Sequence, residues 1–167
     1  MPKLIRWDGA AAHEADDAFV SVADDTEVPA GDVILSLTRF QAEGEALLGE
    51  GRRVGVRVAP EEAVEALAYD LPRLALVALV FPKFRDGRLY SAARVLRERL
   101  EFKGELRASG DVLLEQAPFM IRCGFDSFEP ADGTSVAQWT KAGHRFRHVY
   151  QRAADDLTPA FVEREGG

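Results

Sequence analysis

The stretch LALVALVFPKFRDGR, residues 74–88, contains a strand, a loop and the start of a helix in immediate succession. Residues 74–81 are continuously apolar, as in a parallel strand that is buried on both faces. Lys83, Arg85 and Arg88 then make the loop cationic, and from Leu89 to Leu100 apolar residues recur at helical spacing. A helix that begins directly after a buried strand indicates an α/β fold.

The same alternation extends along the chain on both sides of this stretch. Short apolar runs, separated by helical patterns or turn signals, predict a sheet of about five mainly parallel strands in a single α/β domain. The predicted strands are Val33–Leu37, Arg53–Val58, Leu74–Phe81, Glu105–Ser109 and Phe125–Glu129.

Two architectures agree with this pattern. The first is an open doubly wound sheet. The alternative is half of a (β/α)8-type barrel, because the run Cys123–Phe128 has the helix–Gly–strand character of barrel repeats. Ligands bind at the carboxyl ends of the strands in both architectures. That edge is expected to hold Thr38, Arg39, the cationic loop and Ser109.

The two ends of the chain lack this alternation. Residues 1–31 are acidic and irregular, and we expect an N-terminal arm in which only Phe19–Val22 adds a strand at a sheet edge. The α/β domain is expected to span residues 32–154, followed by a C-terminal tail of residues 155–167. Exposed sheet edges favour a homodimer.

The length, the apolar runs and the net charge of the chain disfavour several classes of protein. At 167 residues the chain has room for one hydrophobic core. No apolar run is long enough to cross a bilayer, and the N-terminus lacks a signal-peptide core, so a cytoplasmic location is expected. The net charge of −7 disfavours binding to nucleic acid or to anionic membranes.

Basic residues concentrate in the middle of this acidic chain. Residues 83–107 hold 8 Lys and Arg against 4 Asp and Glu. Lys83, Arg85 and Arg88 precede a helix N-terminus, where backbone N–H groups and the helix dipole favour an anion. Guanidinium groups grip oxyanions with two hydrogen bonds, so this loop is our candidate anion site. The alternative is a structural ion-pair network in which Asp86 caps the helix or pairs with Arg85 or Arg88.

Further residues extend the candidate site. Tyr90 and Ser91 follow the loop, and their hydroxyl groups suit hydrogen bonding to an oxyanion or proton transfer. Arg107 and Arg122 would enlarge the cationic patch. An ordinary structural role is preferred for Arg122, near a helix C-terminus, and slightly preferred for Arg107.

Several patterns indicate local structure. Thr38 and Gln41 have the spacing of a capping box. Pro60 suits the first turn of a helix, and we expect a helix after it. Gly124 is placed to end a helix in the left-handed conformation, and Pro118 is expected to kink or shorten that helix.

Cysteine and histidine do not indicate a cofactor or a metal. The single cysteine, Cys123, excludes an internal disulfide or a cysteine-held cluster and is expected to be an inert, partly buried thiol. His144 and His148 share a helix face but lack a third ligand, which favours an exposed pair over a metal site. The familiar signatures of nucleotide binding and hydrolysis are absent from the sequence.

Three segments resemble a bacterial family that is catalogued as domain of unknown function 934. They are FPKFRDGRLYSAARVLRERL (81–100), KGELRASGDVL (103–113) and FMIRCGFDSFE (119–129). Members of that family are often labelled probable oxidoreductases of sulfite reduction, because their genes lie beside those for sulfite reductase and phosphoadenylylsulfate reductase. The resemblance implies a role in assimilatory sulfate or sulfite reduction but transfers no catalytic residue. The sequence leaves open whether loops without a known signature bind a flavin or a nicotinamide.

Three functions follow from these patterns. The first is a sulfur-assimilation protein that binds an oxyanion or an oxyanion-bearing ligand at the cationic loop, and the family resemblance implies that it is an oxidoreductase. The second is a noncatalytic partner or assembly factor of sulfite reductase, whose basic face docks on an acidic protein surface. The third is an enzyme of barrel ancestry that acts on a phosphate-bearing substrate.

Overall fold

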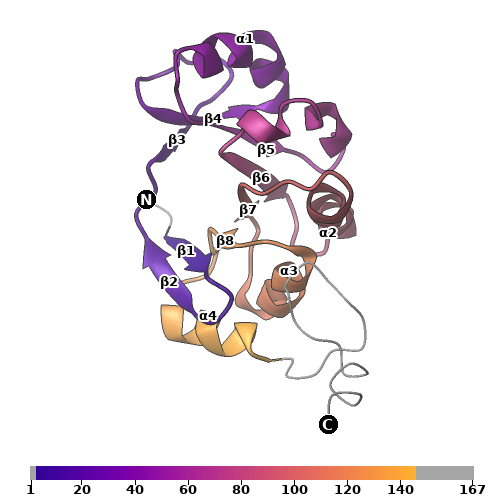
Figure 1. Cartoon of the computed structure of the whole chain (residues 1–167). Helices are drawn as coiled ribbons and strands as arrows, with labels where there is room; N and C mark the ends of the chain where they lie inside the picture. Colours follow the sequence, from indigo (N-terminus) through magenta and orange to yellow (C-terminus); the bar gives the residue numbers. More distant parts are fainter. Residues whose placement is uncertain (1–2, 146–167) are drawn as a thin grey trace.

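A curled eight-stranded sheet organises residues 3–145, which are the residues that the computed structural model describes (Figure 1). The strands lie in the order β2-β1-β8-β7-β6-β5-β4-β3. Their bounds are β1 Leu4–Trp7, β2 Ala12–Ala15, β3 Phe19–Ser21, β4 Asp32–Ser36, β5 Val54–Val58, β6 Leu76–Phe81, β7 Glu105–Gly110 and β8 Ser127–Phe128.

Strands β3 to β8 are parallel and follow one another in sequence order. The five predicted strands are all present, as β4 to β8, but the expected number of about five is too low, because β1 to β3 bring the sheet to eight strands. A doubly wound sheet needs a point where the strand order reverses, and the order here has no such point. The expectation of an open doubly wound sheet is therefore wrong, and the alternative, a half-barrel within one mixed α/β domain, is correct.

The connection between β2 and β3 requires the sheet to curl. These strands form the two opposite edges, yet only residues 16–18 join them. From Ala15 to Phe19 an extended chain spans at most about 14 Å, whereas the edges of a flat eight-stranded sheet would lie roughly 34 Å apart. Residues 16–18 therefore cross the concave side of a strongly curved sheet.

The N-terminal residues belong to this sheet, which differs from the expected irregular arm. β1 pairs antiparallel with both β2 and β8, and β3 extends the parallel sheet beside β4. Only the edge strand near Phe19–Val22 was predicted. β1 and β2 are short and mix apolar with charged residues, as in LIRW and AHEA, so no apolar run reveals them.

Helices cover the outer side of the curved sheet (Figure 1). Their bounds are α1 Leu37–Gly49, α2 Gly87–Arg94, α3 Ala117–Cys123 and α4 Val136–Gly143, and a π-helical turn, Val95–Arg99, continues α2. Two short 3₁₀ turns, Val64–Leu67 and Leu71–Arg73, replace the α-helix expected after Pro60. None of the helices among residues 3–145 is both long enough and apolar enough to cross a membrane.

The ends of α3 and α1 test two predictions made from the sequence. Gly124 ends α3 with φ 102°, as predicted, and Pro118 lies in the first turn of that helix, which begins only at Ala117. The predicted capping box at Thr38 is wrong. The cap of α1 is Ser36, whose hydroxyl accepts a hydrogen bond from the Arg39 N–H at 3.1 Å.

The hydrophobic core lies between the helices and the outer face of the sheet. Alternate strand residues such as Val77 and Leu79 point into it and are fully buried. The concave face has a smaller apolar cluster around Phe19, Ile34 and Leu76. Beside that cluster, β7 places Glu105 and Arg107 on the concave face, because the intervening Leu106 belongs to the outer core.

Candidate functional site

The cationic loop follows β6 at the carboxyl end of the parallel strands, as expected. Its backbone is held at two points. The Phe84 N–H donates to Asp111 Oδ2 at 3.0 Å, and the Asp86 N–H donates to the Lys83 carbonyl at 3.1 Å. Asp111 thus bonds to the loop and does not cap α3. The loop therefore has a defined shape between β6 and α2.

Asp86 forms an ion pair with Arg88. Its Oδ1 accepts from the Arg88 N–H at 3.2 Å and caps α2, while its Oδ2 lies 2.8 Å from Arg88 Nη2. The side-chain hydrogen bond from Arg88 is the main reason why the pKa of Asp86 lies below its usual range. Both structural roles considered for Asp86, the cap and the ion pair, are present together. Arg88 is thus compensated within the loop itself.

Lys83 and Arg85 are the cations of the loop that keep their charge available. Both are exposed. The Arg85 guanidinium carbon lies 5.1 Å from the centroid of the Phe84 ring, which supports the side chain without neutralising it. Within residues 3–145, neither cation has a carboxylate within ion-pair distance. The loop therefore presents two uncompensated positive charges on a fixed backbone.

Tyr90 and Ser91 lie in different surroundings on α2. Tyr90 donates a hydrogen bond to Gln116 Oε1 at 2.8 Å and packs edge-on against Phe81. Burial raises the pKa of Tyr90 to about 12, so its hydroxyl stays protonated near neutral pH. Ser91 is exposed on α2. Tyr90 acts as a hydrogen-bond donor between α2 and the turn before α3.

Arg107 lies apart from the loop, on the concave face of the sheet. Its side chain is fully buried and contacts three carboxylates: Asp17 at 2.7 Å, Glu105 at 2.9 Å and Glu129 at 3.0 Å. Burial alone would lower the pKa of Arg107, but Asp17 and Glu105 outweigh that effect and raise it. Arg107 is therefore the centre of a structural ion-pair network and does not extend the cationic patch.

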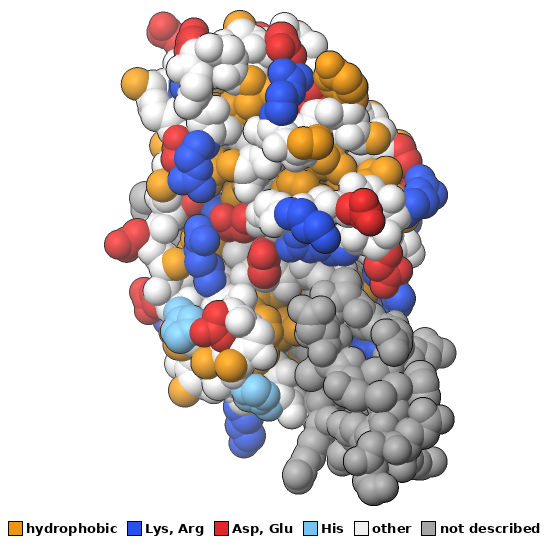
Figure 2. Space-filling view, in the orientation of Figure 1, with side chains coloured by type: hydrophobic (Ala, Val, Ile, Leu, Met, Phe, Trp, Pro, Cys, Tyr) orange, Lys and Arg blue, Asp and Glu red, His pale blue; other side chains and the backbone are white. Residues whose placement is uncertain are grey.

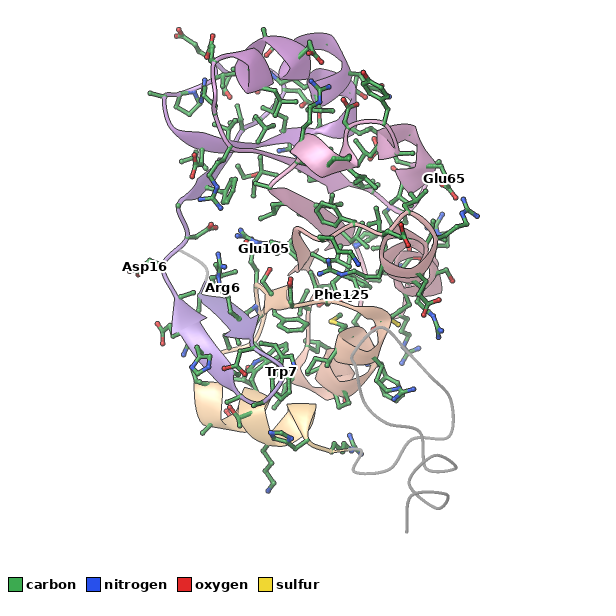
Figure 3. All side chains as sticks on the ribbon, viewed as in Figure 1. Arg6, Trp7, Asp16, Glu65, Glu105 and Phe125 are labelled. Atoms are coloured by element: carbon green, nitrogen blue, oxygen red, sulfur yellow. The ribbon has the colours of Figure 1, made fainter. Side chains whose placement is uncertain are left out.

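Glu105 links this network to the N-terminal hairpin. Its Oε1 accepts from Arg107 and from the Ser127 hydroxyl at 2.7 Å, and its Oε2 accepts from Arg6 at 3.1 Å. Arg6 and Glu105 approach one another from β1 and β7 across the concave side (Figure 3). Asp17, in the connection from β2 to β3, closes the network from the opposite edge.

The sequence did not reveal this network as a whole. Asp17 lies 90 positions from Arg107, and no local pattern brings them together. One signal was present: Glu105 and Arg107 are two residues apart in a predicted strand, so they share one face of the sheet. Two opposite charges on one strand face predict a polar patch within that face.

Three of the cavities that residues 3–145 form lie away from the loop. One of about 730 Å³ lies beside α3 and α4, where Leu114, Pro118 and Ala142 line it. Two others, of about 490 and 410 Å³, lie at the amino-terminal end of the parallel strands. None of the predicted anion-site residues lines these three cavities. The cationic loop therefore lies outside these three cavities.

Histidine and cysteine form no metal site in the described part of the chain. No group of three His, Cys, Asp or Glu side chains there is arranged to hold a metal ion. His144 is exposed and contacts the carbonyl of Ala10, while His148 lies outside the described residues. Cys123 is partly buried, as predicted.

Comparison with known proteins places most of the chain in one family. A family model described as "Bacterial protein of unknown function (DUF934)" matches residues 55–161, which is more than half of the chain. The match begins at β5 and includes the cationic loop, Arg107 and α3. No curated protein matches the chain.

Proposed function

The chain belongs to this bacterial family of unknown function, and from that premise we propose that it is a cytoplasmic protein of sulfur assimilation that binds an oxyanion or an oxyanion-bearing ligand. Lys83 and Arg85 would bind the anion at the carboxyl edge of the sheet. The observation that carries this proposal is the pair of uncompensated cations on a loop fixed by Asp86 and Asp111.

A fixed loop suits anion binding for an energetic reason. Ordering a flexible loop around a ligand costs free energy, and hydrogen bonds already made by Phe84 and Asp86 reduce that cost. Hydrogen bonds from a charged donor to an oxyanion contribute about 1.5–3 kcal/mol each. Two such donors on one loop would both favour the binding of a small anion.

The pathway in this proposal rests on the resemblance of residues 79–129 to a family labelled with sulfite reduction. Sulfite and sulfate are small oxyanions, and phosphoadenylylsulfate carries several oxyanion groups. All three are acceptor-rich ligands for lysine and arginine. An oxidoreductase activity would additionally require a flavin or a nicotinamide to bind.

A thermal-shift screen tests the proposal. The panel contains sulfite, sulfate, phosphate, phosphoadenylylsulfate, NADPH and FMN. A ligand at about 100 times its Kd stabilises the folded protein by about 2.7 kcal/mol, which raises Tm by several degrees. The double variant K83A/R85A should lose the shift for the oxyanion ligands.

The matched control is R94A/R99A, which removes the same charge from surface pairs with Glu98 and Glu65. It should keep the shift. An oxyanion shift that persists in K83A/R85A would place the ligand elsewhere. A silent panel of oxyanions would reject the proposal.

A second candidate function is docking on an acidic surface of sulfite reductase. It is favoured by one observation: the three described cavities lie away from the loop, whose exposed cations suit a flat acidic protein surface. A pull-down with the reductase at low salt should succeed with the wild type and fail with K83A/R85A. Association that is absent at every salt concentration would reject it.

A further inference from the structure

The amino-terminal end of the curled sheet contains a cleft that the proposed function does not use. Arg53, Ala75 and Glu105 line it where β5, β6 and β7 begin, and Trp7 lines it where β1 ends. The cleft has a volume of about 490 Å³ and adjoins the cavity of about 410 Å³ through shared residues, which are Trp7, Asp8, Lys103 and Asp126. Both volumes lie within the range of small-molecule sites.

The carboxylates of this cleft already accept hydrogen bonds. Asp8 accepts from the N–H groups of Ala10 and Ala11, both at 2.8 Å, and from His13. Asp126 Oδ1 accepts from the Leu106 N–H at 2.8 Å, and its Oδ2 accepts from Arg97 at 3.2 Å. The third carboxylate, Glu105, is occupied by the network described above.

The cations of the cleft retain most of their donors. Arg6 is bonded through Nη2 to Glu105, and Arg53 through Nη1 to Asp32 at 3.1 Å. Both side chains are about half exposed. Lys103 is exposed, and within residues 3–145 no hydrogen bond or ion pair of its side chain is present. A guanidinium has five N–H donors and an ammonium has three. Most of the hydrogen-bonding groups that are still unused in the cleft are therefore donors.

Apolar side chains form the adjoining wall. Trp7 is half-buried, and Ile121, Phe102 and Phe125 line the neighbouring cavity. Trp7 packs against the outer hydrophobic core, to which Phe125 belongs. The space-filling view shows basic and acidic side chains interspersed with apolar ones on this face (Figure 2). The site thus combines an apolar wall with spare cationic donors.

We propose that this cleft binds an organic phosphate or sulfate, with the anionic group on Lys103, Arg6 and Arg53 and an apolar or aromatic part against Trp7. The carboxylates of the cleft already accept hydrogen bonds, whereas its cations have unused donors. The cleft therefore suits a ligand that is rich in hydrogen-bond acceptors. The neighbouring wall selects ligands with a hydrophobic body over the free inorganic ion. This site is separate from the loop at the opposite end of the strands.

The experiment follows the Trp7 indole N–H by two-dimensional NMR during titration with phenyl phosphate, inorganic phosphate and phenol. Trp139 supplies an internal reference, because its indole is buried and donates to Thr134. Phenyl phosphate should move the Trp7 signal at lower concentration than inorganic phosphate or phenol. K103A should weaken phenyl phosphate by about tenfold, and K103R should restore most of the affinity.

K83A serves as the matched control, because it removes an exposed lysine from the carboxyl-edge loop. It should leave the titration of Trp7 unchanged. A loss of binding at the cleft is thereby distinguished from a loss of binding at the carboxyl-edge loop. The proposal is overturned if phenyl phosphate does not move the Trp7 signal or if K103A binds as tightly as the wild type. It is also overturned if phenol binds as tightly as phenyl phosphate.

Discussion

Arg107 holds the concave side of the sheet together. Replacing it with Met retains much of the volume but leaves Asp17, Glu105 and Glu129 without their shared cation. Loss of one partner from a buried ionic network costs about 3–5 kcal/mol, and partial exposure of these carboxylates favours the lower end. Urea unfolding of R107M near neutral pH should reveal this loss of stability.

The control for R107M is R99A, which breaks an exposed pair with Glu65 and should cost at most about 1 kcal/mol. A cost for R107M no larger than that of R99A would mean that the network contributes little to stability.

Asp17 should make part of this stability depend on pH. Burial would raise its pKa, but hydrogen bonds from Arg107 and from the Phe19 N–H outweigh burial and lower it. A carboxyl whose folded pKa lies below its unfolded pKa, about 3.9, stabilises the protein above that pH. The contribution is lost as the pH falls through the folded pKa. Chemical unfolding should show a stability difference between wild type and D17N that is largest near neutral pH and shrinks below about pH 4.

A difference between wild type and D17N that grows as the pH falls would contradict the assigned direction of the Asp17 pKa. It would mean that burial dominates over the bond to Arg107.

At the scale of elements, Asp86 combines two roles that substitution can separate. D86N keeps an N-cap side chain for α2, whereas D86A removes it and should cost about 1 kcal/mol of stability. Both variants release Arg88 from its ion pair. Calorimetric titration should therefore show tighter oxyanion binding in both, by roughly fivefold, if the loop is the anion site. Equal stability of D86A and D86N would remove the capping role, and unchanged affinity in both would remove Arg88 from consideration as a ligand.

Elements with strong local signals were predictable, and those that depend on distant contacts were not. The apolar run of β6 and the left-handed Gly124 are fixed by nearby residues, so both were predicted correctly. β1 and β2 have no such signal, because their pairing with each other and with β8 stabilises them. The residues after Pro60 carry a helical apolar spacing, yet they form only 3₁₀ turns that bury Val64 and Leu67.

At the scale of the whole molecule, the sequence predicted the α/β class and the parallel strands but left the architecture open. The distinction depends on strand order, which the periodicity of a strand does not encode. Residues 16–18 decide the curvature, because they tie opposite edges of the sheet. The cationic loop and the pairing of Asp86 with Arg88 were both considered from the sequence, whereas the pairing of Arg107 with Asp17 became visible only in the fold.

We propose above that Lys83 and Arg85 together bind an oxyanion. Isothermal titration calorimetry with sulfite or sulfate tests it most directly, on the wild type, K83A/R85A and R94A/R99A. The wild type and the control should bind saturably, and the affinity of K83A/R85A should be lower by about tenfold or more. Equal affinity in all three proteins, or no binding by the wild type, would contradict it.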